Sequence, residues 1–380
     1  MKTICPSCFH NIFSDILFTR KKCPVLNNVF YDSITDARDC ITGSIRLVQC
    51  LKCGIVFNID YNENLITYYN YYNNSRSNSL RYLNYIESIV ALFTSWLNSS
   101  NMVLEIGCGN GDFLKKLSDT IGCQCEGYDN AYKGEKNYNN RVLFNNYIFN
   151  PIKNKKKYDI IVLRHILEHI PQISFFFETL CSSNNLNKKG KIFIEVPDLN
   201  WIIKKNAFYD ITYEHCNYFF TDIICDLLRR YDFKIIKTMK VFDMQYLIVC
   251  GLYDKVKTNN DQFSFPIIDK LFKNIKNKKQ KLIDSIKMAK NVCIWGTSGK
   301  GVIFLSDLAD DVLNKIDYVI DIDPLKQGKF LPLSAKRVDH PDVLKKVEGE
   351  LLVIIMNNIY KQEILLKLNQ MNVSASLISV

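Results

Sequence analysis

The pattern of apolar and polar positions changes near residue 100. Beyond that point, short apolar runs alternate with stretches in which apolar residues recur at helical spacing. Because nearly continuous apolar strands between helices are typical of a parallel sheet covered on both faces, the pattern predicts a doubly wound α/β sheet. Its strands are expected at residues 102–106, 123–128, 142–144, 158–163 and 191–196.

Two further stretches flank this predicted sheet. Residues 61–100 are expected to be helical and rich in tyrosine, because the apolar positions of residues 80–97 recur at helical spacing. After a predicted linker at 254–262, a second alternation begins. It predicts strands at 292–295, 318–320 and 351–357 and a closing helix at 362–368. We therefore expect three parts, residues 1–60, 61–255 and 256–380.

The first strand of the predicted sheet ends in a turn with three alternate glycines, Gly107, Gly109 and Gly111. Such glycines let the backbone approach a ligand closely, and the helix that follows begins with unpaired N–H groups. Glu105 lies on the strand, and Asp129 lies about 20 residues beyond the turn, where a second strand carries a carboxylate for ribose hydroxyls. The pattern favours a nucleotide or nucleoside site over a turn without a ligand.

The E-x-G-x-G-x-G form of this turn resembles motif I of class I S-adenosylmethionine-dependent methyltransferases. It differs from the G-x-G-x-x-G form of nicotinamide dehydrogenases, in keeping with a cofactor that has no pyrophosphate. The resemblance implies that S-adenosylmethionine is bound by Glu105, Gly107, Gly109, Gly111 and Asp129.

Two C-x2-C pairs in the first sixty residues predict a structural zinc site. Each pair brings two thiolates onto one tight turn, and two such turns complete a tetrahedral site. A lobe of this size cannot hold itself by a core alone, so zinc would contribute to folding. Cys23 or Cys40 could replace a ligand, but their spacing favours ordinary packing, and His10 is expected at the surface. The expected ligands are Cys5, Cys8, Cys50 and Cys53.

Composition limits the remaining possibilities. A hydrophobic content of 47% argues against disorder, and no apolar run approaches the roughly 20 residues that span a bilayer. The start of the chain has no apolar secretory core, so we expect a cytoplasmic protein without membrane insertion whose cysteines are thiols or metal ligands. The net charge of +10 fits an anionic substrate. The lysines are scattered without interleaved aromatic residues, which disfavours nucleic acid.

A second cluster of candidate catalytic residues follows the fifth predicted strand, where Tyr213, Glu214 and His215 are adjacent. An imidazole with a pKa near 6.5 can act as a general base at neutral pH; a core histidine bonded to backbone is the alternative. Glu168 and His169 also follow a strand end. They could be catalytic, but the methyltransferase resemblance places them along the cofactor cleft.

The order of these motifs resembles the sugar C-methyltransferase family, which methylates C-3 of nucleotide-linked 4-keto-deoxysugars. The resemblance covers nearly the whole chain and implies a zinc lobe, a methyltransferase domain and a C-terminal Rossmann-like domain. The family's E-H pair matches Glu214 and His215, with Tyr213 ahead of it, and its N-terminal active-site tyrosine matches Tyr72. One feature departs from the family: residues 242–246 replace a His-Gly-Gly-Ser turn.

The resemblance implies a mechanism based on carbon acidity. His215, oriented by Glu214, would remove a proton from the carbon beside the ketone. Tyr213 or Tyr72 would then donate a hydrogen bond to the enolate oxygen. An O- or N-methyltransferase, in which His215 deprotonates another group, and a non-catalytic nucleotide-binding scaffold remain open. Read alone, the C-terminal glycine turn at 294–301, with Asp321 after the next strand, predicts a dinucleotide-type half site. A vestigial fold without a dinucleotide is the alternative, and the resemblance implies that a nucleotide-sugar phosphate could bind near Lys300. The three-part chain could stand as a monomer.

Overall fold

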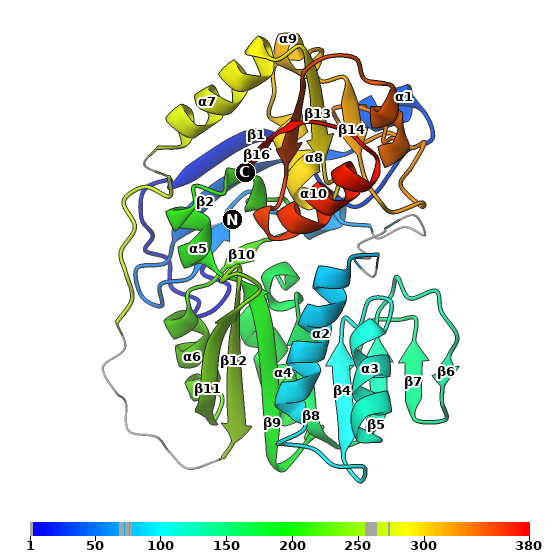
Figure 1. Ribbon diagram of the computed structural model, residues 1–380. Helices are drawn as coiled ribbons and strands as arrows, with labels where there is room; N and C mark the ends of the chain where they lie inside the picture. The colour runs from blue at the N-terminus through cyan, green and yellow to red at the C-terminus, as the bar shows by residue number, and fades with distance from the viewer. Residues whose placement is uncertain (1–2, 68–71, 73–75, 77, 255–263, 273) are drawn as a thin grey trace.

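The protein is built around a central eight-stranded sheet, with a four-stranded sheet formed mainly by N-terminal residues and another formed by C-terminal residues. The computed structural model describes residues 3–67, 72, 76, 78–254, 264–272 and 274–380. In Figure 1 the central sheet occupies the lower half of the molecule and the C-terminal sheet the upper half. Helix α10 (Lys361–Gln370) lies above the start of α2 (Leu80–Phe93).

The central sheet has the order β11-β12-β9-β8-β4-β5-β7-β6. Strands β7, β5, β4, β8 and β9 pair in parallel, and β12 lies antiparallel between β9 and β11. All five strands expected from apolar runs are present. The bounds are β4 Met102–Ile106, β5 Gln124–Tyr128, β6 Asn137–Tyr138, β7 Val142–Asn145, β8 Tyr158–Arg164, β9 Leu186–Pro197, β11 Phe233–Val241 and β12 Tyr246–Tyr253.

Helices cover both faces of this sheet, which explains why its inner strands are apolar on both sides. Helix α2 turns Ile86, Ile89 and Phe93 inward, and the Phe93 ring meets those of Phe113 on α3 and Phe193 on β9 at 5.3 and 5.0 Å between centroids. The remaining helices of this part are α3 Asp112–Ile121, α4 Ile173–Ser182, α5 Leu199–Lys204 and α6 Thr221–Arg230.

The N-terminal lobe is joined to the middle of the chain by strand pairing. Its sheet has the order β1-β2-β3-β10, and its last strand, β10, comes directly after the segment that contains His215. Asn217 and Tyr218 of β10 pair with Phe57 and Val56 of β3. The lobe thus directly supports a predicted catalytic segment. The bounds are β1 Phe18–Pro24, α1 Ile34–Arg38, β2 Thr42–Gln49, β3 Val56–Asn58 and β10 Asn217–Tyr218.

The C-terminal sheet is parallel throughout, with the order β14-β13-β15-β16. The strands and closing helix expected in this region are confirmed, within a few residues at their ends. The bounds are α7 Ile275–Met288, β13 Asn291–Trp295, α8 Gly299–Ser306, α9 Asp310–Leu313, β14 Tyr318–Ile320, β15 Leu351–Ile355, α10 Lys361–Gln370 and β16 Ser376–Ser379.

Two expectations differ from the structure or lie beyond it. The helical prediction for 61–100 is right for α2 but too long, because the described residues from 61 to 79 form a 3-10 turn at Glu63–Leu65 and an isolated bridge between Tyr72 and Val29. The linker expected at 254–262 lies outside the described residues except for Asp254, and the division into three parts stays a prediction. None of the described helices is both long and apolar enough to span a membrane.

Candidate functional site

The turn after β4 depends on its glycines. Gly107, Gly109 and Gly111 have φ values of 75°, 53° and 78°, a region that disfavours side chains. A Cβ at Gly111 would lie 2.4 Å from the Phe144 ring, and one at Gly107 would lie 1.9 Å from Ile166 Cδ1. The loop is therefore packed from outside, and its backbone is the surface that a ligand could approach.

Two carboxylates accompany this turn, as expected. Asp129 accepts hydrogen bonds from Gly109 N and Ala131 N, each at 2.8 Å, so it shapes the loop as well as facing it. Glu105 is buried, and its Oε2 has no hydrogen-bond partner among the described residues. Burial raises the pKa of Glu105 to about 8. A buried oxygen without a donor fits the ammonium group of S-adenosylmethionine.

Residues 165–169 connect this turn to the second predicted cluster. Ile166 packs on Gly107, while the following 3-10 turn, Leu167–His169, places His169 beside His215. His165 at the end of β8 has a φ of 54°, a strained conformation for a non-glycine residue. One short segment therefore contacts both the predicted cofactor loop and the predicted base.

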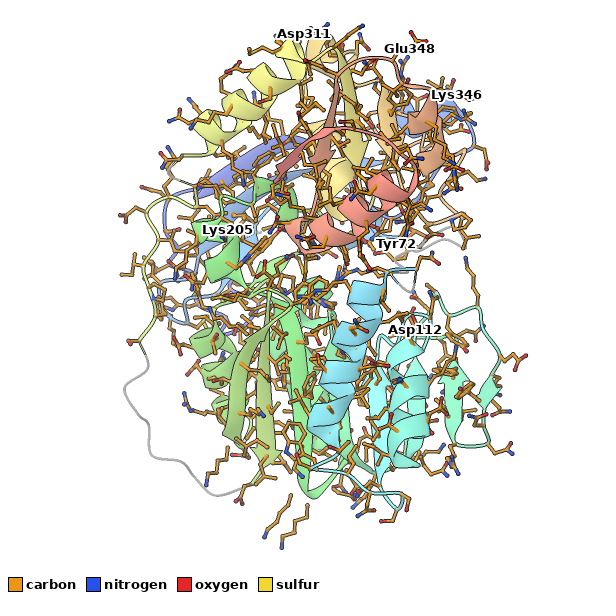
Figure 2. The ribbon with its side chains drawn as sticks, viewed as in Figure 1. Tyr72, Asp112, Lys205, Asp311, Lys346 and Glu348 are labelled. Atoms are coloured by element: carbon orange, nitrogen blue, oxygen red, sulfur yellow. The ribbon has the colours of Figure 1, made fainter. Side chains whose placement is uncertain are left out.

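A cavity of about 620 Å³ lies between the central sheet and the C-terminal part. Tyr72, Glu214 and His215 line it together, as predicted, and Lys300 lines it from the C-terminal part. Figure 2 shows Tyr72 where the two halves of the molecule meet. The glycine turn after β4 is not among the lining residues of this cavity, so the predicted site residues form two neighbouring groups.

Tyr72 and Glu214 are hydrogen-bonded to each other. The Tyr72 hydroxyl donates to Glu214 Oε1 at 2.8 Å, and Asn27 N donates to Glu214 Oε2 at 2.9 Å. Burial raises the pKa of Glu214, although the charge of His169 opposes this. The prediction that Glu214 orients His215 is not supported by these contacts, because both carboxylate oxygens bond to other residues.

Glu168 and His169, rather than Glu214, are the neighbours of His215. The His169 and His215 rings meet edge to face at 4.9 Å between centroids. A carboxylate oxygen of Glu168 and one nitrogen of each ring lie within 4.8 Å of one another. Behind them, His165 Nδ1 lies 3.4 Å from Glu168 Oε1, and His165 Nε2 lies 3.0 Å from Glu195 Oε1.

The surroundings of His215 and Glu168 determine which of these two side chains carries a proton. Desolvation within the cavity, followed by the charge of His169, lowers the pKa of His215 to about 3. Burial opposes ionisation of Glu168, but contact with His165 and the charge of His169 hold the pKa of Glu168 below its usual value. At neutral pH the cavity therefore contains an uncharged imidazole at His215 beside an ionised carboxylate.

The prediction that Tyr213 faces the substrate is wrong, because its side chain points away from the cavity. This side chain is fully buried in the N-terminal lobe, where its hydroxyl accepts a hydrogen bond from Asn62 N and its ring stacks on Tyr61. The glycine at position 43 leaves space for the Tyr213 ring, since a Cβ there would lie 2.1 Å from that ring. Adjacent Thr212 lines the cavity instead, and its buried hydroxyl has no partner among the described residues.

Two of the basic side chains that line the cavity are Lys300 and Arg76. Lys300 Nζ donates to Gln245 Oε1 at 2.9 Å and lies 3.1 Å from Asp210 Oδ2; burial lowers the pKa of Lys300. Arg76 donates to the Tyr246 hydroxyl at 2.6 Å. Gln245 and Tyr246 occupy the segment that departs from the family's turn. Sequence reasoning singled out this segment, but it missed Arg76 because no motif marks that residue.

The C-terminal glycine turn lines the same cavity, but its acidic residue is not free for a ribose. Asp321 Oδ2 accepts hydrogen bonds from Thr297 N at 3.0 Å and from Lys326 Nζ at 3.2 Å, and Oδ1 accepts one from Asp323 N. Gly301 must lack a side chain because a Cβ would lie 2.0 Å from the Gly296 carbonyl oxygen. The choice between a dinucleotide half site and a vestigial fold stays a prediction, and Lys300 is one of several residues of this region that line the cavity.

The four predicted zinc ligands converge. Cys5 and Cys53 Sγ atoms lie 3.6 Å apart, as do those of Cys8 and Cys50, and all four lie within 4.8 Å of one another. A tetrahedral zinc thiolate site with bonds near 2.3 Å has sulfurs about 3.8 Å apart, so the group fits zinc. Cys23 and His10 lie outside it, as expected.

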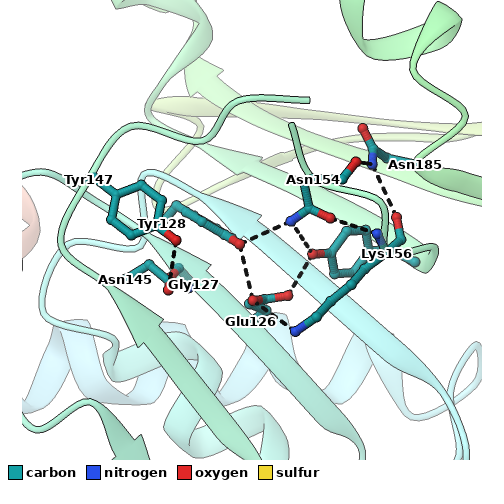
Figure 3. Close-up of polar contacts among 9 residues, drawn as sticks. Glu126, Gly127, Tyr128, Asn145, Tyr147, Asn154, Lys156 and Asn185 are labelled. Atoms are coloured by element: carbon teal, nitrogen blue, oxygen red, sulfur yellow. Dashed lines mark hydrogen bonds and ion pairs between the residues drawn. The ribbon is translucent and has the colours of Figure 1, made fainter. Parts of the chain in front are cut away.

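A separate buried carboxylate, Glu126, has a structural position (Figure 3). It accepts hydrogen bonds from the hydroxyls of Tyr158 at 2.6 Å and Tyr128 at 3.0 Å, and Lys156 Nζ lies 3.2 Å away. These contacts tie β5 to β8 and so hold Asp129, which follows β5. Glu126 does not line the cavity.

Two family models match most of the chain. Residues 78–238 match the model of a methyltransferase domain, and residues 264–378 match that of a C-methyltransferase C-terminal domain. By its domains, the chain is an S-adenosylmethionine-dependent methyltransferase. Its strand order is that of the class I fold, which confirms the predicted fold class.

This methyltransferase is also similar to individual proteins. The ubiquinone biosynthesis O-methyltransferase of Pelagibacter ubique (strain HTCC1062) is 32% identical over 113 residues, which cover 28% of this chain and 45% of that protein. The chain thus spans less than half the length of this curated relative. Among solved structures, magnesium protoporphyrin IX methyltransferase from Synechocystis PCC 6803 with bound SAH is 17% identical, with 46% and 84% of the two chains covered and a TM-score of 0.37. The 1,6-didemethyltoxoflavin-N1-methyltransferase of Burkholderia thailandensis is 16% identical, with 44% and 77% covered and a TM-score of 0.36.

Proposed function

We propose that this methyltransferase transfers a methyl group to a carbon beside the ketone of a nucleotide-linked deoxysugar. The observation that carries the proposal is the composition of one cavity. An uncharged imidazole, a hydrogen-bonded tyrosine and several basic side chains, among them Arg76 and Lys300, line it, and both matched domains contribute. The match of residues 264–378 to a C-methyltransferase domain supports carbon over oxygen as the acceptor.

The glycine turn would hold the cofactor. Gly107, Gly109 and Gly111 expose backbone to it, Glu105 accepts from its ammonium group, and Asp129 shapes the loop and faces the ribose. S-adenosylmethionine supplies a methyl group already activated on a sulfonium. The protein's part is therefore to create and aim a nucleophile.

His215 is the proposed base. A proton-free imidazole can accept the proton of the carbon next to the ketone, whose bonding electrons then form the enolate. Tyr72 reaches the same cavity and would donate to the developing enolate oxygen once it turns from Glu214. One well-aimed donor of this kind contributes about 3 kcal/mol. Tyr213 has no part in this step, because it points into the lobe.

Basic side chains of the cavity would bind the diphosphate. Lys300 and Arg76 supply two positive charges, and Gln245 holds Lys300 in place. We expect Lys300→Glu to lower nucleotide-sugar affinity at least tenfold while S-adenosylhomocysteine affinity stays unchanged, as measured by calorimetric titration. Equal nucleotide-sugar affinity in the variant would contradict this placement.

A direct product assay tests the function. The protein would be incubated with nucleoside diphosphate-linked 4-keto-6-deoxyhexoses and a ¹³C-methyl donor, and the product's new bond identified by NMR. A methyl carbon bonded to ring carbon supports the proposal. A methoxy signal would support the second candidate, O-methylation with His215 acting on a hydroxyl, which the similarity to an O-methyltransferase favours. Zinc at Cys5, Cys8, Cys50 and Cys53 is proposed to be structural, and no step uses it.

A further inference from the structure

Glu168 is a buried carboxylate of the cavity to which the proposed function gives no role. It lies in the 3-10 turn after β8 with 1% of its surface exposed. Among the described residues, its Oε2 has no hydrogen-bond partner, and Oε1 has only the 3.4 Å contact with His165 Nδ1. An ionised carboxylate is rarely left in this state, because burying it without donors is costly.

The donors that could satisfy Glu168 are the two imidazoles in front of it. The Nδ1 atoms of His169 and His215 are also buried and without partners among the described residues. These groups converge within 4.8 Å, a distance that a small rotation of either ring turns into a hydrogen bond. Glu214, which precedes His215 in sequence, already bonds to Tyr72 and Asn27.

We propose that Glu168, and not Glu214, is the carboxylate that positions His215 for proton abstraction. This inference rests on the proposed function. When the C–H bond beside the ketone breaks, its electron pair forms the enolate and its proton moves to His215. Glu168 then lies next to the resulting imidazolium and balances its charge. The carboxylate also fixes which ring nitrogen carries hydrogen, as an acidic partner does for histidine in hydrolase triads.

His165 and Glu195 hold Glu168 from behind. His165 contacts both carboxylates, and Arg164 Nε donates to Glu195 Oε2 at 2.9 Å. His165 also meets the Tyr246 ring edge to face at 4.4 Å between centroids. The positive φ of His165 orients its ring so that it lies between the carboxylates of Glu168 and Glu195. Glu168 is a positioning residue in this arrangement, because it acts through His215.

The test is proton exchange without methyl transfer. Wild type, Glu168→Gln and Glu168→Asp would be incubated in D₂O with a nucleoside diphosphate-linked 4-keto-6-deoxyhexose and no S-adenosylmethionine. Deuterium entry at the carbon beside the ketone is followed by NMR from about pH 2.5 to 9, a range that includes the pKa of about 3 of His215. We expect Glu168→Gln to slow exchange about 10²-fold with KM within threefold of wild type. Its acid limb should move to lower pH, because His215 loses a neighbouring negative charge. Glu168→Asp should recover part of the rate.

Glu126→Gln is the matched control, since it also removes a buried carboxylate but outside the cavity. It should lower the melting temperature and leave the shape of the pH profile unchanged. Wild-type exchange in Glu168→Gln, or a loss confined to KM, would overturn the inference. So would a second metal equivalent that Glu168→Gln removes, because a metal would then occupy the cluster. If wild type itself shows no exchange while methylating a hydroxyl, the proposed function fails rather than this assignment.

Discussion

At the scale of single residues, the site combines groups that packing requires with groups that chemistry requires. The glycines after β4 are fixed by their φ values and by neighbouring side chains. Glu105, Glu168 and Thr212 instead have buried oxygens without partners among the described residues, a state that packing alone does not favour. The first group could be read from a motif. The second could not, because a motif does not show which atoms lack partners.

Gly111→Ala tests the first group. The added Cβ would combine an unfavourable φ of 78° with a 2.4 Å contact to the buried Phe144 ring. We expect a cost of about 3 kcal/mol and at least tenfold weaker S-adenosylhomocysteine binding, measured by thermal unfolding and titration. Gly328→Ala is the control, since its φ is 81° but no atom lies within 4 Å. Equal losses in the two variants would contradict the role of packing.

Glu105→Gln tests the second group through pH. Because the folded pKa is raised from 4.5 to about 8, the folded protein binds one more proton than the unfolded chain between these values. The free energy of unfolding should therefore fall with rising pH in this range, by about 1.4 kcal/mol per unit from this group. Glu105→Gln should flatten that part of the slope and be more stable than wild type above pH 8, without cofactor. An unchanged slope in urea unfolding would contradict the raised pKa.

At the scale of elements, apolar periodicity predicted the strands well and the connections poorly. Buried strands such as β4 and β8 are nearly continuous apolar runs, so local sequence identifies them. The pairing of β10 with β3 joins residues far apart in the chain and leaves no local signal. Tyr213 was misassigned for the same reason, since it lies in a bend whose orientation depends on contacts with the distant residues Tyr61 and Asn62 of the lobe.

The N-terminal lobe, with its proposed zinc site, should influence catalysis through these elements. Cys53 leads into β3, β3 pairs with β10, and β10 follows His215; Asn58 N also donates to Cys216 O at 2.9 Å. We expect chelation or Cys53→Ser to release one zinc per chain and to increase amide exchange in β3 and β10. Methyl transfer should fall more than S-adenosylhomocysteine affinity. Intact activity in zinc-free protein would contradict this coupling.

At the scale of the whole molecule, the cavity exists because three parts of the chain meet. The lobe supplies Asn27, the middle supplies His215 and Gln245, and the C-terminal part supplies Lys300. Glu363 on α10 also accepts hydrogen bonds at the start of α2, from the Ser79 hydroxyl and Arg81 N. The sequence predicted most of these segments but not their convergence, because contacts between domains depend on surfaces that local patterns do not encode.

The most direct test of the central claim is deuterium entry at the carbon beside the ketone, without S-adenosylmethionine, in wild type and His215→Asn. The account predicts exchange in wild type and a loss of at least 10²-fold in the variant, with nucleotide-sugar binding retained. Exchange at the wild-type rate in His215→Asn would contradict the claim that this imidazole makes the carbon nucleophile.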